Sequence, residues 1–411
     1  MRLLVISPHL EPDTAPTGVI ISAILEELSQ AGIDIHVITS LPWYEKHKVA
    51  KEWNIKGLRR FIRTDSEKYG KVTRCYPFPS SKNSLVARSL GFAGFTTLTA
   101  IPALFNRTKF DAVITISPPL TLGLVGWMAS RRHRCPLVLN IQDVFPDVAV
   151  QVGAIKSPRL ISIFEKLELF CYKKAKAISV LSQDLAQNVK SKTGFDDSRV
   201  VVIPNFVDTE KILPLNQDTV YREELGLGDR IVIMYAGNLG HSQSLDLLIE
   251  AANRHQDRDD VMYVINGGGA AAKELEQKVK DLPNFVFTGF QPIDRLPEVL
   301  ASADIHVVLL KQGLGTSSLP SKIYSIFAAG RPAIASVDPE TELSRVLSET
   351  KAGIAVKPEE VEEFIAAIER LIDNSAERTE MGAMGRLWIE KQPTAKIVAE
   401  IYKDLLERFN K

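Results

Sequence analysis

Short apolar runs alternate with helical patterns along the first half of the chain. Apolar runs occupy residues 3–6 and 33–39, and between them residues 18–30 repeat apolar positions at helical spacing. This alternation predicts strands separated by helices. Further apolar runs follow at 112–116, 137–141, 177–181 and 200–203, with a helical pattern at 160–174. The pattern predicts a parallel sheet with helices on its faces.

The same rhythm restarts after residue 216. Strand-like runs occur at 230–236, 261–266, 284–288, 304–310 and 332–336, between helical patterns at 244–255, 271–281, 296–302, 321–329 and 359–374. The sequence therefore predicts an α/β protein of two tandem Rossmann-like, doubly wound domains that face a central cleft.

Prolines divide this pattern into segments. Pro204 and Pro214 interrupt it in the middle of the chain, and Gln392-Pro393 precedes a final helical stretch. We expect an N-terminal domain at 1–205, a C-terminal domain at 206–392, and a terminal helix at 393–411 that returns to the N-terminal domain. The length of 411 residues also exceeds what one hydrophobic core organises.

Two long apolar stretches, 89–106 and 112–130, could be mistaken for membrane spans. Pro102 lies in the first and Pro118-Pro119 in the second, so buried helices and strands explain them better. The apolar run at the N-terminus is too short for a signal peptide, and the three cysteines are widely spaced. These features favour a reducing, cytoplasmic location.

A zero net charge hides an uneven distribution of charge. Residues 1–205 hold 27 Lys and Arg against 17 Asp and Glu, and 46–109 alone hold 14 against 3. Residues 46–109 also contain aromatic residues that we expect to be exposed, namely Trp53, Phe61, Tyr76 and Phe78, and the apolar stretch 91–105. Together these features predict contact with an anionic membrane surface, at the inner face of the plasma membrane. The alternative is that the apolar stretch packs inside the domain and the charges are solvated.

In the first domain, candidate chemistry lies in the loop 7–17. Gly18 follows this loop at a predicted helix start, where free amides favour an anion, although an ordinary turn glycine fits equally well. His9 could orient an acceptor hydroxyl, or it could simply be solvated. Neither domain carries a dinucleotide or P-loop glycine fingerprint after its first strand, which disfavours dehydrogenases and P-loop NTPases.

In the second domain, glycines follow two predicted strands. Gly237, Asn238 and Gly240 follow the first, and the run around Gly268 follows the next; they allow close approach to a ligand, or form flexible turns.

The sharpest pattern is Ser317-Ser318-Leu319-Pro320-Ser321-Lys322, which opens a predicted helix. A cation in a first helical turn is unfavourable unless an anion shares the position, so Lys322 indicates a diphosphate site. The alternative is an ordinary surface lysine.

At these residues the sequence resembles the family 4 retaining glycosyltransferases, which have the two-domain GT-B fold. The resemblance rests on residues 202–208, 235–238, 284–289, 303–305, 328–336 and 353–356 and, more loosely, on Gly18 and 139–147. The branch that it most resembles contains bacterial transferases for O-antigen and colanic-acid-like polysaccharides, which share the Leu-Pro-Ser-Lys segment and the Gly-Asn-x-Gly loop.

This resemblance implies a nucleotide-sugar donor, with a UDP-sugar favoured, on the second domain and an acceptor on the first. It implies no cofactor, no metal ion and no nucleic-acid partner. Lys322, Glu342, Asp143 and His9 are the catalytic candidates. The donor-binding candidates are Gly18, Gly237, Asn238, Gly240, Gly268, Phe290, Gln291, Ser318, Leu319 and Ser321. The nucleobase is expected near Phe290 and Gln291.

The sequence also departs from this family. Ser317 and Ser325 stand where the family carries two glutamates, and its diphosphate-clamping Arg and Lys are replaced within 238–244. Lys322 would then supply most of the positive charge. Glu342 matches a later family glutamate that can reach the donor, or is an exposed acid at a helix start.

The leading interpretation is a glycosyltransferase that acts on a lipid-linked or polysaccharide acceptor in bacterial surface-glycan synthesis. Two alternatives are a nucleotide-sugar epimerase on the same scaffold and a non-enzymatic small-molecule binding protein.

Overall fold

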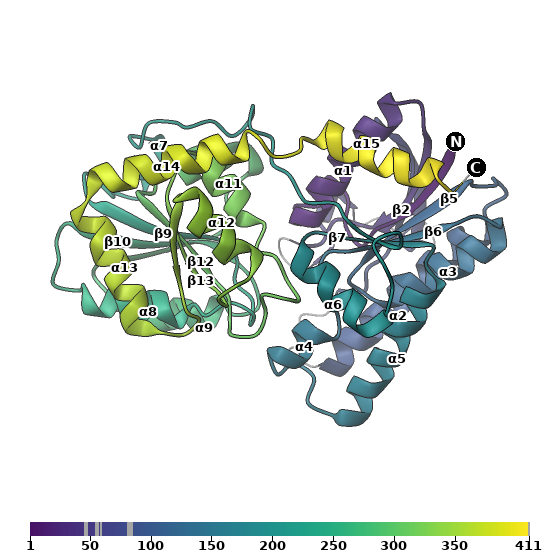
Figure 1. The fold of residues 1–411 in the computed structure, drawn as a ribbon, viewed down its shortest axis with the longest axis horizontal. Helices are drawn as coiled ribbons and strands as arrows, with labels where there is room; N and C mark the ends of the chain where they lie inside the picture. Colours follow the sequence, from purple (N-terminus) through teal and green to yellow (C-terminus); the bar gives the residue numbers. More distant parts are fainter. Residues whose placement is uncertain (45–47, 54–56, 58–59, 80–84, 410–411) are drawn as a thin grey trace. The chain divides into compact units, whose positions relative to one another are not determined.

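A computed structural model describes residues 1–44, 48–53, 57, 60–79 and 85–409, with the side chains of 85–90 left aside. The chain divides into two compact units (Figure 1). Unit 1 contains 1–205 together with 393–411, and unit 2 contains 206–392. Each unit is described by itself.

Unit 1 is built on one sheet in the order β3-β4-β2-β1-β5-β6-β7-β8. The strands are β1 (Arg2–Ile6), β2 (Asp34–Ser40), β3 (Ile62–Glu67), β4 (Gly70–Cys75), β5 (Ala112–Ser117), β6 (Leu137–Ile141), β7 (Ala177–Val180) and β8 (Val200–Val202). All neighbouring strands run parallel except β3 and β4, which are antiparallel. The predicted α/β class is therefore confirmed, but the sheet is mixed at one edge. The β3–β4 hairpin was not predicted because β3 is mostly polar and has no buried residue, so it lacks the apolar run of an inner strand.

Helices cover both faces of this sheet. They are α1 (Pro16–Gln30), α2 (Leu85–Phe105), α3 (Thr121–His133), α4 (Asp147–Gln151), α5 (Pro158–Lys174), α6 (Gln183–Thr193) and α15 (Ala395–Glu407), with a 3₁₀ turn at Lys51–Trp53. Helix α1 packs against α15, while α3 packs against both α2 and α5 on the other face (Figure 1). The buried Tyr402 of α15 contacts Asn140 Nδ2 at 2.7 Å and Ser179 Oγ at 3.1 Å, so the terminal helix is tied to β6 and β7.

The two apolar stretches form α/β elements. Residues 89–106 fall largely in α2, and 112–130 form β5 and most of α3. Phe95, Thr99 and Ala103 of α2 are buried, whereas Ile101 and Phe105 are exposed. Among the described residues, no helix combines the length and apolarity that crossing a membrane requires.

Unit 2 contains an all-parallel sheet in the order β11-β10-β9-β12-β13-β14. Its strands are β9 (Ile231–Asn238), β10 (Val261–Gly268), β11 (Phe285–Thr288), β12 (Ile305–Leu309), β13 (Ala333–Ser336) and β14 (Gly353–Val356). The helices are α7 (Val220–Glu224), α8 (Asp246–Arg254), α9 (Ala272–Val279), α10 (Leu296–Ala301), α11 (Lys322–Ala328), α12 (Glu342–Thr350), α13 (Val361–Asp373) and α14 (Ser375–Ile389), with a 3₁₀ turn at Ile293–Arg295. Strand order reverses direction between β9 and β12, the position at which such sheets bind ligands.

Both faces of the unit 2 sheet are buried. Ile233 and Tyr263 pack into a core with α8 and α13, while Val232, Met234 and Val264 pack into a second core on the opposite face. Strands buried on both sides read as continuous apolar runs, which explains why sequence periodicity located them well.

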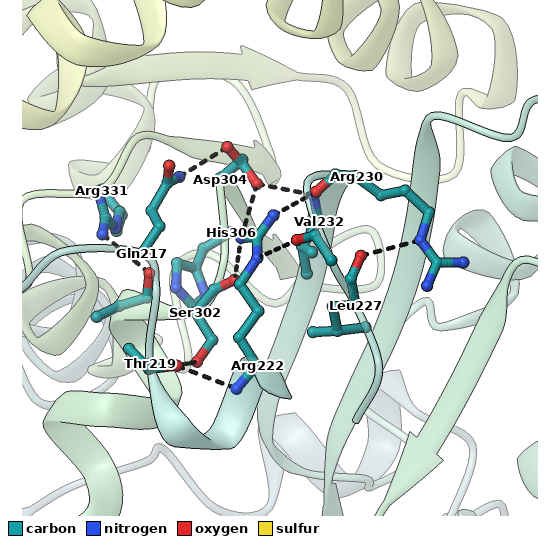
Figure 2. Close-up of polar contacts among 12 residues, drawn as sticks. Gln217, Thr219, Arg222, Leu227, Arg230, Val232, Ser302, Asp304, His306 and Arg331 are labelled. Carbon is teal, nitrogen blue, oxygen red and sulfur yellow. Dashed lines mark hydrogen bonds and ion pairs between the residues drawn. The ribbon is translucent and has the colours of Figure 1, made fainter. Parts of the chain in front are cut away.

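A buried ion pair joins the amino ends of the two central strands of unit 2 (Figure 2). Asp304, directly before β12, accepts hydrogen bonds from Val232 N–H of β9 at 2.9 Å and from Gln217 Nε2 at 2.7 Å. Arg222 Nη1 lies 3.3 Å from the same carboxylate and also donates to the Ser302 carbonyl at 2.9 Å. This network fastens the segment that enters unit 2 to the edge of the sheet opposite the strands' carboxyl ends.

Candidate functional site

The carboxyl ends of β9 and β10 approach each other very closely. Gly237 pairs with Gly267, and Asn238 pairs with Gly268. A Cβ atom on Gly267 would lie 1.9 Å from the Gly237 carbonyl oxygen, and one on Gly269 would lie 2.5 Å from the Leu239 carbonyl oxygen. Any side chain would therefore push the strands apart. These glycines serve strand pairing and are not a flexible turn.

Lys322 reaches this same place from the start of α11. Its Nζ lies 3.5 Å from the centroid of the Tyr235 ring. A Cβ atom on Gly237 would be only 3.2 Å from that Nζ. Although the residue as a whole is half-buried, the ammonium is enclosed and has no hydrogen-bond partner among the described residues. The surface-lysine alternative is therefore wrong.

The enclosed ammonium of Lys322 is electrostatically unsatisfied. Burial lowers the pKa of Lys322 from 10.5 to about 7. The Tyr235 ring offers a cation–π contact, but it replaces neither the hydration shell nor the counter-charge. An anion at this position would restore the charged form, so the geometry fits phosphate recognition.

Phe290 and Gln291 lie at the same edge of the sheet. The Phe290 ring covers Gly268, where a Cβ atom would meet it at 3.1 Å, and the side chain is 38% exposed. Gln291 Nε2 donates to Thr288 Oγ1 and to the Gly289 carbonyl, each at 3.3 Å. The structure thus brings an exposed aromatic face near the glycines that adjoin Lys322.

The loop after β9 is internally bonded. Gly240 N–H donates to Gln243 Oε1 at 2.8 Å, and the Asn238 carbonyl accepts from Tyr235 O–H at 2.7 Å. The next helix begins at Asp246, and its N-cap is Leu245. Ser242 and Ser244 precede this helix in the sequence, but neither of them caps it. A phosphate that used the Gly240 amide would have to displace Gln243.

The segment between β12 and α11 carries the remaining donor-binding candidates of unit 2. The Asp338 carboxylate accepts the N–H groups of Gly313 at 2.9 Å and Gly315 at 3.0 Å, which fixes the loop before Ser317. Ser317 is fully buried, and its Oγ has no partner among the described residues. Half-buried Ser318, Leu319 and Ser321 lie between it and Lys322.

Ser317 and Ser325 stand where the related family carries glutamates, so these positions offer hydroxyl groups in place of carboxylates. Ser325 is half-buried within α11, one turn beyond Lys322.

Glu342 is the first residue of α12 and is half-buried. Burial, and then the charge of Glu342, raise the pKa of Tyr324 in α11. Glu342 is therefore close to α11 and is not simply an exposed acid.

In unit 1, His9 is held in place by a buried acid. His9 Nδ1 lies 2.7 Å from Asp13 Oδ2, and the Asp13 side chain is 2% exposed. Asp13 also accepts the Tyr44 backbone N–H at 3.0 Å, and the His9 ring stacks on Trp43 with centroids 5.8 Å apart. The alternative of a freely solvated histidine is therefore wrong.

Gly18 and Asp143 belong to the same edge of the unit 1 sheet as His9. Helix α1 begins at Pro16, two residues earlier than predicted, and a Cβ atom on Gly18 would lie 3.2 Å from His9 Cβ. Asp143 follows the end of β6 by two residues. His9 and Gly18 are therefore in direct contact, and Asp143 lies just beyond the carboxyl end of β6, at the same edge of the sheet.

Sequence reasoning missed two residues that shape these positions. Tyr235 supplies the face under Lys322, and Asp13 orients His9. Asp13 lies four residues after His9, a spacing that brings side chains together in a helix, but the sequence predicts a loop there. Tyr235 lies in a predicted strand, where a tyrosine looks like an ordinary core residue.

Comparison with known proteins extends this description. A family model described as "Glycosyl transferases group 1" matches residues 230–374, and one described as "Glycosyl transferase 4-like domain" matches residues 17–205. The chain is 28% identical over 385 residues to the "Putative colanic acid biosynthesis glycosyl transferase WcaI" of Escherichia coli strain K12, covering 90% of this chain and 92% of that protein.

Two further matches have informative names. The "UDP-Gal:alpha-D-GlcNAc-diphosphoundecaprenol alpha-1,3-galactosyltransferase" of Escherichia coli is 24% identical over 288 residues, covering 68% of this chain and 70% of that protein. The crystal structure of Anabaena Alr3699/HepE in complex with UDP-glucose aligns with a TM-score of 0.72 at 16% identity, covering 99% of this chain and 100% of that one. At this identity the structural match shows the fold alone.

We predict that binding of a nucleoside diphosphate such as UDP at pH 8 takes up a proton. With a pKa of about 7, Lys322 is mostly neutral at pH 8 before binding, and a nearby diphosphate raises that pKa. Calorimetric titration in two buffers of different ionisation enthalpy should show an uptake approaching about one proton per ligand.

The matched control is Lys322→Met, which keeps the length of the side chain without a titrating group. Its proton uptake should fall close to zero. Equal uptake by the two proteins would show that Lys322 does not meet the diphosphate.

Proposed function

We propose that this chain, which belongs to the group 1 and 4-like glycosyltransferases, moves a sugar from a UDP-sugar to a lipid-linked or polysaccharide acceptor in bacterial surface-glycan assembly. It is an enzyme with the GT-B fold. The observation that carries the proposal is the enclosed ammonium of Lys322, which has no hydrogen-bond partner among the described residues and lies beside Gly237 at the carboxyl edge of the unit 2 sheet.

The donor half of the proposal rests on unit 2. The nucleobase would stack on the exposed face of Phe290, and the diphosphate would extend toward Lys322. The bond between the anomeric carbon and the diphosphate oxygen breaks during transfer, so negative charge grows on the leaving phosphate. A preorganised ammonium stabilises that charge more strongly in an enclosed site than in water. We propose that transfer retains the anomeric configuration, as in the family that the sequence resembles.

The acceptor half rests on unit 1. His9 is oriented by Asp13, and its other ring nitrogen, Nε2, remains to bind an acceptor hydroxyl. Asp143 contributes a carboxylate from the carboxyl end of β6. The relative from Escherichia coli whose name includes a diphosphoundecaprenol-linked sugar supports a lipid-linked acceptor for this chain.

We predict that Lys322→Ala lowers the rate of sugar transfer by about 10² to 10³, which corresponds to about 2–4 kcal/mol in the activation barrier. The free energy of unfolding should not decrease, because the change removes an enclosed ammonium that has no hydrogen-bond partner in the described part of the chain. Steady-state transfer assays and denaturant unfolding measure the two effects separately.

The control is Lys322→Arg, which retains the charge but places it differently. We expect its activity to lie between those of the wild type and Lys322→Ala. A rate unchanged in Lys322→Ala would place the leaving phosphate elsewhere.

We also predict that transfer continues after treatment with EDTA. Lys322 would supply the positive charge that a divalent cation contributes in other transferases. Among the described residues, no group of three or more His, Cys, Asp or Glu side chains is arranged to hold a metal ion. The assay compares turnover with and without the chelator, and loss of turnover that Mg²⁺ or Mn²⁺ restores would contradict this prediction.

We propose that residues 46–109 dock unit 1 on the cytoplasmic face of an anionic membrane. Lys56 and Arg59 lie outside the described residues. The aromatic residues expected to be exposed are half-buried instead: Arg63 lies 4.0 Å from the Trp53 ring centroid, and Arg60 lies 4.6 Å from that of Phe61. The apolar surface comes from α2, where Ile101 is 44% exposed and Phe105 is 78% exposed.

We predict that the protein sediments with vesicles containing phosphatidylglycerol but not with pure phosphatidylcholine vesicles. Each cation near the surface contributes about 1 kcal/mol, so charge reversal of Lys56, Arg59, Arg60 and Arg63 to Glu should release the protein, as should added salt. Lys273→Glu, an exposed change in unit 2, serves as the control. Protein that stays in the supernatant at low salt would argue for a soluble acceptor.

A further inference from the structure

Unit 1 contains a strongly cationic pocket that the proposed transfer reaction does not use. The pocket encloses about 980 Å³. Its wall includes Trp127 and Phe409, and none of its lining residues is Asp or Glu. The basic lining residues are Arg131, Lys173, Lys174, Lys176, Arg199 and Arg408.

The pocket lies at the amino ends of the strands. Leu137 begins β6, Lys176 directly precedes β7, and Arg199 directly precedes β8. Arg408 and Phe409, just after α15, complete the wall. The substrate residues of this unit, His9 and Asp143, follow the carboxyl ends of β1 and β6 instead. The pocket is therefore at the opposite edge of the sheet and is a separate site.

In the part of the chain that the structure describes, none of the six cations that line this pocket forms an ion pair. Nearby acids are bonded to other groups: Asp197 pairs with Lys190, Asp111 accepts the Arg2 backbone N–H, and Asp196, beside the pocket, accepts from the lining residue Ser198. Because the lining itself has six cations and no carboxylate, the pocket carries a net positive charge.

Helix dipoles explain only part of this accumulation. Arg131 lies in the last turn of α3, and Lys173 and Lys174 lie in the last turn of α5, where cations are commonly favourable. Lys176 and Arg199 belong to loops before strands, so the same reason does not apply to them.

Several of these cations are positioned by the protein itself. Arg199 Nη2 donates to the Ala175 carbonyl at 2.6 Å, and its guanidinium lies 3.7 Å from the Phe195 ring centroid. Lys176 Nζ lies 5.7 Å from the ring centroid of Phe409. These contacts hold positive charge at the pocket and reduce the ordering cost when an anion binds.

We infer that this pocket binds a multiply charged phosphate group, either a free diphosphate-type anion or the headgroup of an anionic lipid. Ammonium and guanidinium groups converging on one concave surface, with no carboxylate among them, match a ligand that carries more than one negative charge. The half-buried aromatic wall leaves space beside the charges for an attached organic group.

The test uses the full chain, with inorganic pyrophosphate as the soluble probe and UDP present at saturation to occupy the donor site. Calorimetry should detect pyrophosphate binding that weakens with salt. The double change Lys173→Glu and Lys176→Glu should weaken this binding at least about tenfold. Both side chains are exposed, so the fold should be retained.

The matched control is Arg159→Glu with Lys166→Glu, which reverses two exposed charges on α5 outside the pocket. It should leave pyrophosphate affinity nearly unchanged. A repeat in the Lys322→Met background separates the two sites, because loss of pyrophosphate binding there would mean that the probe had measured the donor site and would overturn the inference.

Vesicles distinguish the two sources of phosphate. If sedimentation with vesicles containing cardiolipin, whose headgroup carries two phosphates, falls in the Lys173 and Lys176 variant but not in its control, the pocket takes a lipid headgroup. Pyrophosphate binding alone indicates a soluble ligand. Absence of both, or equal binding by the variant and its control, would overturn the inference.

Discussion

The Asp304 carboxylate connects the two strands on which the unit 2 site depends. It accepts a hydrogen bond from Val232 of β9 and contacts Arg222, while directly preceding β12 (Figure 2). Both charged side chains are only 8% exposed, and a buried charge is tolerable only when it is paired and hydrogen-bonded. This contact fixes the amino ends of β9 and β12 to each other, and because the two strands are parallel neighbours, their carboxyl ends lie side by side at the opposite edge of the sheet.

At the carboxyl ends of the same strands, the Lys322 ammonium lacks the hydrogen bonds and opposite charge that the Asp304 network has, among the described residues. Strand β9 ends in Gly237 and Asn238, and the chain after β12 leads to Lys322, whose ammonium is enclosed without a hydrogen-bond partner in the described structure. The Arg222–Asp304 pair at the amino ends is thus ion-paired and hydrogen-bonded, whereas Lys322 at the carboxyl ends retains an electrostatic deficit that a ligand phosphate would remove. Strain or imbalance of this kind is tolerated where function requires it and the surrounding fold is rigid.

Unit 1 uses charge differently. Its substrate candidates centre on His9, whose ring is fixed by Asp13 and by stacking on Trp43. Its excess of cations lies elsewhere, in the segment 46–109 and in the pocket at the opposite edge of the sheet. The net positive charge of the first half therefore gives no direct guide to the acceptor position.

The sequence by itself determined the α/β class, two doubly wound sheets, most strand positions and the place of Lys322 at a helix start, because continuous apolar runs and helix-start residues are local signals. Only the tertiary structure decided which groups meet. The polar β3 pairs with β4, Tyr235 lies beneath Lys322, and Asp13 orients His9. The free energy of a buried charge depends on its three-dimensional surroundings, so a sequence pattern can place a lysine at a helix start but cannot show whether it is enclosed or which groups satisfy it.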